Sequence, residues 1–236
     1  MLLWRKRLIK IADIEVDYID HMGTDASVSR AARVSFANDG KDFDDVKDTK
    51  LIQYLAKHGH ISPFHHTFIT VRVKAPIFVR SQAVKHKFMP VNEVSRRYCD
   101  DDFEFYIPQD WRLRAENVKQ GSSDEIFNGL MFINNDGDGD NHGDAHDAAK
   151  HVAQVSLDIY NGMLSKGICP EMARSCLPQS MMTTFYWSGT LSAFADMLKL
   201  RLDSHAQKEI QYMAQKIRDI IEPLFPVSLK ALLNNG

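Results

Sequence analysis

The amino-acid sequence predicts an α+β fold, in which a mixed or antiparallel sheet is flanked by helices and the C-terminal half is helical. Two observations support this prediction. Residues 66–76, HTFITVRVKAP, alternate apolar and polar side chains as a half-buried strand does. Residues 45–59 and 145–167 instead repeat their apolar side chains at helical spacing. The chain has 236 residues, 44% of them hydrophobic, so we expect a single domain over residues 1–236 with one core.

Ten elements are expected along the chain. They are a strand over residues 7–19, helices over 25–36 and 45–59, a strand over 66–76, helices over 77–87 and 145–167, a short helix from Pro170, a strand over 181–187, and helices over 190–202 and 205–225.

Residue types at the boundaries justify the elements of the first half. Asp25 is the expected N-cap of the first helix, because its carboxylate can accept a hydrogen bond from a free backbone N–H group. Gly59 supplies the stop of the second helix. Pro76 is expected to open the next helix and Pro90 to end it, since proline is tolerated at the first helical position but not within a helix. The alternation of the strand puts one set of side chains on one face, namely Ile69, Val71 and Val73.

The second half begins with a segment that is hard to interpret. We expect an exposed insertion over about residues 112–150, because the polar run at 134–147 cannot bury enough apolar area to offset its conformational entropy. The helix over 145–167 follows from the spacing of Val152, Val155, Ile159 and Met163. Threonine and aromatic residues favour a strand over 181–187.

Composition and charge exclude several classes of function. The 29 Lys and Arg residues and 31 Asp and Glu residues give a formal net charge of -2, which argues against nucleic acid or an acidic membrane as partner. No apolar run is long enough to span a membrane, and residues 1–10 lack the features of a signal peptide. We therefore expect a soluble, cytoplasmic protein whose three cysteines, Cys99, Cys169 and Cys176, are reduced thiols.

Residues 80–98 concentrate positive charge in a chain that is not basic overall. The cations there are Arg80, Lys85, Lys87, Arg96 and Arg97. Such a run is often only a solvated helix face. Here it is interspersed with Gln82, Asn92, Glu93 and Ser95, which are hydrogen-bonding groups that solvation does not require. We interpret the segment as a site for a small anion, with arginine forks suited to phosphate.

The same segment resembles the signature of flavin-dependent thymidylate synthases, Q-x-x-R-H-R-x-x-S-x-N-E-x-S-x-R-Y. The residues that carry the resemblance are Gln82, Lys85-His86-Lys87, Asn92-Glu93, Ser95 and Arg97-Tyr98. Further blocks similar to the family lie, in the family's order, at residues 31–36, 57–64, 73–79, 171–178 and 200–211. They cover most of the chain outside residues 112–150.

The resemblance implies a fold, an activity and an assembly. The fold would be that of the family, in a homotetramer whose active sites are shared between subunits. The activity would be reductive methylation of dUMP to dTMP with FAD as cofactor, methylenetetrahydrofolate as carbon donor and NADPH as reductant. A redox cofactor is chemically necessary for this reaction, because no side chain provides a hydride. Two alternatives stay open: a related modification such as hydroxymethylation, and a non-catalytic nucleotide-binding paralogue.

The resemblance also implies residue roles on the nucleotide side. The residues that match dUMP contacts are Gln82, Glu93, Ser95, Arg97, Arg174 and Arg201. Arg201 and Ser95 are assigned to catalysis. An arginine at the carbonyl edge of uracil would stabilise negative charge that develops on the ring. The simpler alternative for Arg201 is an ion pair with Asp203.

On the flavin side the match is less complete. The residues assigned to FAD are Ser35, His60, Ser62, His65, Lys85, His86, Lys87, Asn92, Thr190, Ser192, Asp196, Leu200 and His205. The positions that depart from the family's usual residues are His65, Lys85, Lys87, Pro90, Thr190, Ser192 and Asp196. We expect the two lysines that flank His86 to disfavour its protonated form by like charge.

Metal and thiol chemistry are weaker interpretations. The four histidines His58, His60, His65 and His66 match no common zinc pattern, so no metal is expected. Residues 136–144 match a calcium loop poorly, because glycine and the bidentate glutamate are missing from their positions. For Cys169 and Cys176 we favour packing as small hydrophobic residues over a role as nucleophile.

Overall fold

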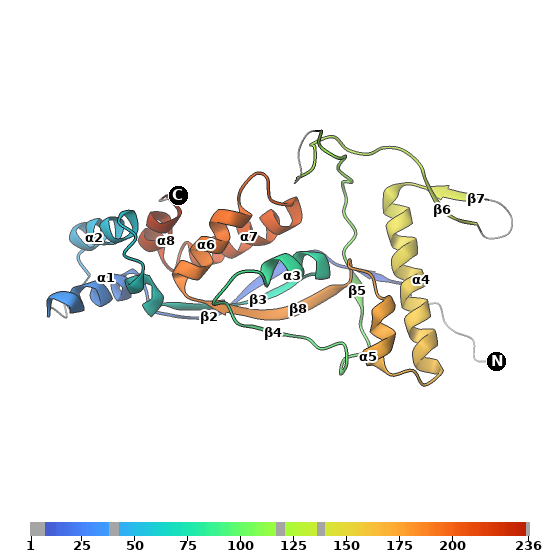
Figure 1. The fold of residues 1–236 in the computed structure, drawn as a ribbon, viewed down its shortest axis with the longest axis horizontal. Helices are drawn as coiled ribbons and strands as arrows, with labels where there is room; N and C mark the ends of the chain where they lie inside the picture. The colour runs from blue at the N-terminus through green and yellow to red at the C-terminus, as the bar shows by residue number, and fades with distance from the viewer. Residues whose placement is uncertain (1–7, 38–42, 117–120, 136–139, 235–236) are drawn as a thin grey trace. The chain divides into compact units, whose positions relative to one another are not determined.

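The computed structural model describes residues 8–37, 43–116, 121–135 and 140–234 (Figure 1). By its contacts the chain divides into two compact units. Unit 1 comprises Met1–Ile14, Lys74–Arg80 and Val94–Thr183, and unit 2 comprises Glu15–Val73, Ser81–Glu93 and Thr184–Gly236. The single domain expected from the sequence stays a prediction.

Strands and helices both occur along the chain. The described strands are β1 (Lys10–Ile11), β2 (Glu15–Met22), β3 (Phe68–Pro76), β4 (Val91–Glu93), β5 (Glu104–Phe105), β6 (Met131–Asn135), β7 (Asp140–Gly143) and β8 (Met182–Gly189). The described α-helices are α1 (Asp25–Arg33), α2 (Asp45–Lys57), α3 (Ile77–Ala83), α4 (Ala145–Ser165), α5 (Pro170–Ala173), α6 (Leu191–Arg201), α7 (Lys208–Ile221) and α8 (Pro226–Leu233). Short 3₁₀ segments span Val34–Phe36, Ser62–His66 and Arg174–Cys176. The predicted fold class, including the helical C-terminal half, is confirmed.

Unit 2 is built on a four-stranded sheet with the strand order β2-β3-β8-β4. The short strand β4 runs antiparallel to β8, with Val91 opposite Trp187 and Glu93 opposite Phe185. Ile69, Val71 and Val73 are fully buried, as the alternation of β3 predicts. The turn that carries Lys85, His86 and Lys87 lies between α3 and β4, so this register fixes the chain directly after it.

The helices of unit 2 cover the sheet and one another (Figure 1). Helix α7 packs on β2, α6 packs on α7 and α8, and α8 also contacts α2. Asp25 is not the N-cap of α1, because Thr24 takes that position. The buried Asp25 carboxylate instead accepts hydrogen bonds of 2.9 Å from both Val227 N–H and Ser228 N–H. It therefore caps α8, whose N-cap residue Phe225 has no side-chain acceptor for these N–H groups.

Unit 1 has a core of its own, formed where α4 meets β5 and α5. The buried residues of this cluster are Phe103, Phe105, Ala153, Leu157, Tyr160, Ala173 and Met181. Phe103 and Tyr160 meet edge to face with ring centroids 4.9 Å apart. Of the α4 residues predicted to form an apolar stripe, Met163 packs against this core, whereas Val152, Val155 and Ile159 lie outside it and are exposed.

Several expected boundaries were wrong. The strand predicted over 7–19 is interrupted, and its parts join different sheets: β1 pairs with β5 and β2 with β3. Helix α3 ends at Ala83, well before Pro90, because the chain turns at residues 84–89. The helix predicted over 205–225 spans Lys208–Ile221, and the short helix α8 that follows was not predicted.

The region 112–150 contains more order than predicted. Its described part forms the antiparallel hairpin of β6 and β7 and the start of α4. Arg112 and Ile126 add an isolated antiparallel bridge. The polar run 134–147 lies partly outside the described residues, and the exposed insertion stays a prediction.

Two further sequence expectations can be compared with the structure. Within the described part of the chain, no helix combines the length and apolar character needed to cross a bilayer. The thiols of Cys99, Cys169 and Cys176 are free. Core packing of Cys169 was a wrong expectation, because this residue is the exposed N-cap of α5.

Candidate functional site

Unit 2 contains a cavity of about 720 Å³ that gathers many of the predicted site residues. It is lined by His65, Lys85, His86, Lys87, Phe88, Thr190, Ser192, Ala193, Asp196 and Leu200. These residues come from the 3₁₀ segment Ser62–His66, the turn after α3 and helix α6. Its size lies within the range of small-molecule and cofactor pockets, and its wall combines cations, hydroxyls and apolar groups.

Helix α6 supplies one wall because of its residue spacing. Ser192, Asp196 and Leu200 are four residues apart and so lie on one helix face, toward the cavity. The other faces of the helix are fully buried in unit 2, and Phe194 and Leu198 have no exposed area. The hydroxyl of Thr190 caps the helix by accepting from Ala193 N–H at 3.3 Å. Burial of α6 therefore fixes the position of its polar face.

The turn after α3 supplies the opposite, cationic wall. Hydrogen bonds from Lys85 N–H to Gln82 O and from His86 N–H to Ala83 O, of 3.4 and 3.2 Å, close the turn. Phe88 then takes φ 59°, in the left-handed region that a bulky residue rarely occupies. Its side chain is 89% exposed although it lines the cavity. A strained backbone that presents an exposed ring is typical of a functional position.

Arg201, at the end of α6, joins the two walls. Its Nε donates to Nε2 of His86 at 2.9 Å, and its Nη2 donates to the Gln82 carbonyl at 3.1 Å. The Gln82 side chain is fixed in turn, since its Nε2 donates to Oε1 of Gln207 at 2.6 Å. The ion pair between Arg201 and Asp203, the simpler alternative, is not formed. The Asp203 carboxylate instead accepts from the backbone N–H and Nδ1 of His205.

His86 is neutral in this arrangement. Desolvation by burial lowers its pKa below the usual value, the charge of Arg201 lowers it further, and Asp196 opposes both effects. The lowered pKa agrees with the prediction that the protonated form of His86 is disfavoured. The predicted cause was wrong, because burial and the charge of Arg201 lower the pKa in place of the flanking lysines. Burial also lowers the pKa of Arg201, yet a guanidinium stays charged at neutral pH.

The residues assigned to dUMP are divided between the two units. Gln82, Glu93 and Arg201 belong to unit 2, and Ser95, Arg97 and Arg174 to unit 1. Ser95 Oγ accepts from Arg97 N–H at 3.3 Å, while the Arg97 guanidinium lies over the Tyr98 ring. Arg97 and Arg174 are exposed, as residues that contact a ligand in solution must be before binding.

The residues assigned to FAD fall into two groups. Eight of them line the cavity: His65, Lys85, His86, Lys87, Thr190, Ser192, Asp196 and Leu200. Among the residues that the structure describes, the lining does not include Ser35, His60, Ser62, Asn92 or His205. His60 lies instead beside Tyr54, with ring centroids 6.1 Å apart.

Three residues of the site were not found from the sequence. Phe88 and Ala193 line the cavity, and Gln207 holds Gln82. Phe88 lies directly after Lys85-His86-Lys87, but positive φ at an aromatic residue leaves no sequence signal. Gln207 is 125 residues from its partner, and only the fold brings the two amides together.

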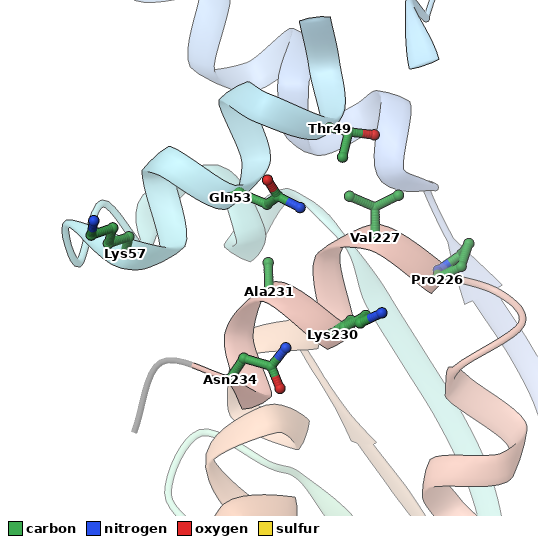
Figure 2. Close-up of a pocket in the computed structure, with 8 residues that line it drawn as sticks. All are labelled: Thr49, Gln53, Lys57, Pro226, Val227, Lys230, Ala231 and Asn234. Atoms are coloured by element: carbon green, nitrogen blue, oxygen red, sulfur yellow. The ribbon is translucent and has the colours of Figure 1, made fainter. Parts of the chain in front are cut away.

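A second cavity, of about 450 Å³, lies between α2 and α8 (Figure 2). Its lining residues are Thr49, Gln53, Lys57, Pro226, Val227, Lys230, Ala231 and Asn234. None of them was assigned a role from the sequence. In Figure 2 the ammonium ends of Lys57 and Lys230 point away from each other, so the two cations do not converge on one ligand position.

No group of three or more His, Cys, Asp or Glu side chains within the described residues is placed to hold a metal ion. The weak calcium-loop match at residues 136–144 lies partly outside the described residues.

Comparison with known proteins identifies related chains over almost the whole length. The sequence profile of the family described as "Thymidylate synthase complementing protein" matches residues 17–227. The "Flavin-dependent thymidylate synthase" of Thermotoga neapolitana is 37% identical over 218 residues, which are 92% of this chain and 90% of the relative. That of Kosmotoga olearia is 36% identical over 92% of this chain and 88% of the relative.

Solved structures are similar as well. The crystal structure of the UMP/dUMP methylase PolB from Streptomyces cacaoi bound with 5-Br dUMP has a TM-score of 0.79 at 30% identity. The alignment covers 97% of this chain and 98% of that chain. A second structure of PolB, bound with 5-Br UMP, has a TM-score of 0.76 at 28% identity.

Proposed function

Because the chain belongs to the thymidylate synthase complementing protein family, that of the flavin-dependent thymidylate synthases, we propose that it methylates dUMP to dTMP with FAD as cofactor. We include methylenetetrahydrofolate as carbon donor and NADPH as reductant in the proposal. The observation that carries it, beside family membership, is the 720 Å³ cavity that eight residues assigned to FAD line, one of which, His86, accepts a hydrogen bond from Arg201.

The cavity has the groups that FAD would need. Lys85 and Lys87 are cations suited to anionic parts of the cofactor, while Thr190 and Ser192 offer hydroxyls 3.0 Å apart. Phe88 and Leu200 offer apolar contact for a ring system. When bound, FAD supplies the hydride chemistry that side chains lack. The lysines keep the charge of the family's arginines but not their planar fork, so they would hold phosphate as point charges.

Arg201 is the residue to which we assign stabilisation of the uracil ring. It is partly buried and already held by two acceptors, so little reorganisation is needed when negative charge develops on a substrate. We assign Ser95, Arg97 and Arg174 to the nucleotide with Gln82 and Glu93, and Ser95 also to catalysis, on the basis of the family match.

We further propose a homotetramer with shared active sites. It would explain why Ser35, His60, Ser62, Asn92 and His205 do not line the described cavity, since a neighbouring subunit could supply such residues. It would also cover the exposed apolar side chains of α4, which a monomer leaves in water. A cytoplasmic location is part of the proposal and agrees with three free thiols.

The absorbance spectrum of the purified protein tests the function. We expect bound flavin that NADPH bleaches, and dTMP formation when dUMP and methylenetetrahydrofolate are added. Arg201→Lys keeps the positive charge but not the planar guanidinium. The variant should therefore retain flavin, and its turnover rate should fall by about tenfold or more. A colourless protein that binds dUMP and cannot be reconstituted with FAD would favour the non-catalytic alternative. A product heavier than dTMP by one oxygen atom would favour hydroxymethylation.

A second substrate is favoured by one observation. The PolB structures align over nearly the whole chain, and PolB is a methylase of both UMP and dUMP. UMP is therefore a candidate substrate beside dUMP. Turnover of the two nucleotides by the same flavin-loaded preparation, compared as kcat/KM, separates a strict dUMP enzyme from one that accepts both.

A further inference from the structure

We infer that His86 is a positioning residue: as a neutral acceptor it holds the Arg201 guanidinium in place, and its protonation releases Arg201 and weakens nucleotide binding. This inference rests on the proposed function, because it assigns Arg201 to the nucleotide. It goes beyond that function by giving the site a dependence on proton concentration and by identifying the residue responsible.

The direction of one hydrogen bond is the first step. Arginine has only donors, so the 2.9 Å contact between Arg201 Nε and His86 Nε2 requires a lone pair on Nε2. The proton of the neutral ring must then be on Nδ1. Protonation of Nε2 would place two donors and two positive charges against each other. The contact therefore exists only while the imidazole is neutral.

The second step is that Arg201 has few other restraints. Its second contact is the Gln82 carbonyl, which also accepts from Lys85 N–H within the turn. Loss of His86 as acceptor leaves the long side chain attached through Nη2 alone. Because a guanidinium that binds a planar ring edge must be correctly oriented, loss of one of two restraints should reduce affinity.

The surroundings of His86 set the pH range. Lys85 and Lys87 come from its own turn, Arg201 and Asp196 from α6, and His65 from the 3₁₀ segment across the cavity. The Trp187 ring of β8 covers the remaining side, 6.2 Å away. Desolvation and Arg201 lower the His86 pKa below 6.5 against the effect of Asp196. The neutral acceptor therefore predominates at pH 7, and it is lost as the pH falls through that lowered pKa.

Titration of dUMP into the flavin-loaded protein by calorimetry, from pH 8 down to the lowest pH at which the protein remains folded, tests the inference. The substitutions are His86→Gln, whose amide oxygen can accept in place of Nε2, and His86→Leu, which cannot accept. His151→Gln, in α4, is the matched control. At pH 8 we expect the Kd of His86→Gln within about threefold of the original protein and that of His86→Leu raised about tenfold or more.

The pH series separates His86 from the nucleotide. The phosphate of dUMP itself titrates near pH 6. Its effect is common to all variants, so it cancels in the ratio of the Kd of the original protein to that of His86→Gln. This ratio should be constant above pH 6.5 and rise at lower pH. The ratio of the Kd of the original protein to that of His151→Gln should stay constant throughout.

Two results would overturn the inference. One is equal Kd values for His86→Gln and His86→Leu at pH 8, and the other is a ratio that stays flat down to the lowest pH at which the protein remains folded. If the original protein bound no dUMP at any pH, the proposed function itself would fail, and the inference with it. Normal dUMP binding with a flat ratio would remove only the role of His86.

Discussion

At the scale of single residues, the site depends on side chains held in unusual states. His86 is a neutral acceptor beside a permanent cation, and Phe88 combines a left-handed backbone with an exposed ring. Both follow Lys85 in one turn, so the turn orients a cation, an acceptor and an aromatic group toward the same cavity. The strain at Phe88 is tolerated because β4 and α3 fix the chain on either side.

The strain at Phe88 gives a prediction about stability and cofactor affinity. Phe88→Gly should raise the free energy of unfolding by roughly 1 kcal/mol, because glycine takes φ 59° without a Cβ clash. The same change should weaken FAD retention, since the ring is lost from the cavity wall. Phe88→Ala removes the ring and keeps the strain, so it is the matched control. Thermal unfolding should separate the two variants, whereas both should release flavin faster than the original protein. Equal stability of the two variants, or flavin retention unchanged in both, would contradict the prediction.

At the scale of elements, the helices of unit 2 are joined by buried charged groups. Asp48 of α2 is fully buried and forms an ion pair with Arg33 of α1. Asp48 also accepts a hydrogen bond of 2.7 Å from the backbone N–H of Asp44, and the side chain of Asp44 caps α2. Asp25 connects α1 with α8 in the same way, through two backbone donors. These contacts hold the helices next to α6, whose polar face lines the cavity.

The cap of α8 can be tested directly. Asp25→Ala should lower the free energy of unfolding by about 2 kcal/mol or more, because two buried N–H groups of α8 lose a charged acceptor. Asp45→Ala is the control, since Asp45 is an exposed first-turn aspartate of α2, and should change stability by about 1 kcal/mol or less. Denaturant unfolding curves measure both. Similar losses in the two variants would show that the cap contributes little.

At the scale of the whole molecule, the remaining apolar surface points to assembly. Val152, Val155 and Ile159 follow one another at spacings of three and four residues, so they form an exposed apolar stripe on α4. The buried side of the same helix packs Ala153, Leu157 and Tyr160 into the core of unit 1. A helix apolar on two sides is expected where a second surface covers one of them.

The proposed tetramer leads to a prediction for this stripe. Val155→Glu should dissociate the tetramer, because burial of an uncompensated carboxylate in an apolar interface is strongly unfavourable. Ser165→Glu adds the same charge at an exposed polar position of α4 and should leave the mass unchanged. Sedimentation analysis reports the assembly state. A tetramer that persists in Val155→Glu would place the subunit interface elsewhere.

The sequence by itself determined the local features of this protein. The alternation of β3, the glycine stop near Gly59 and the Lys85-His86-Lys87 signature all depend on neighbouring residues, and they sufficed for the fold class and the family. They did not suffice for the end of α3, for α8 or for the partner of Asp25. Contacts between segments decide these features.

Only the tertiary structure decided how the site is assembled. Arg201 and His86 are 115 residues apart, and Gln82 and Gln207 are 125 residues apart. Spacing within an element fixes which side chains share a face, but it says nothing about which face of another element lies opposite. That choice depends on burial of α6 against the sheet and its neighbouring helices. The same burial lowers the pKa of His86 and so makes it an acceptor for Arg201.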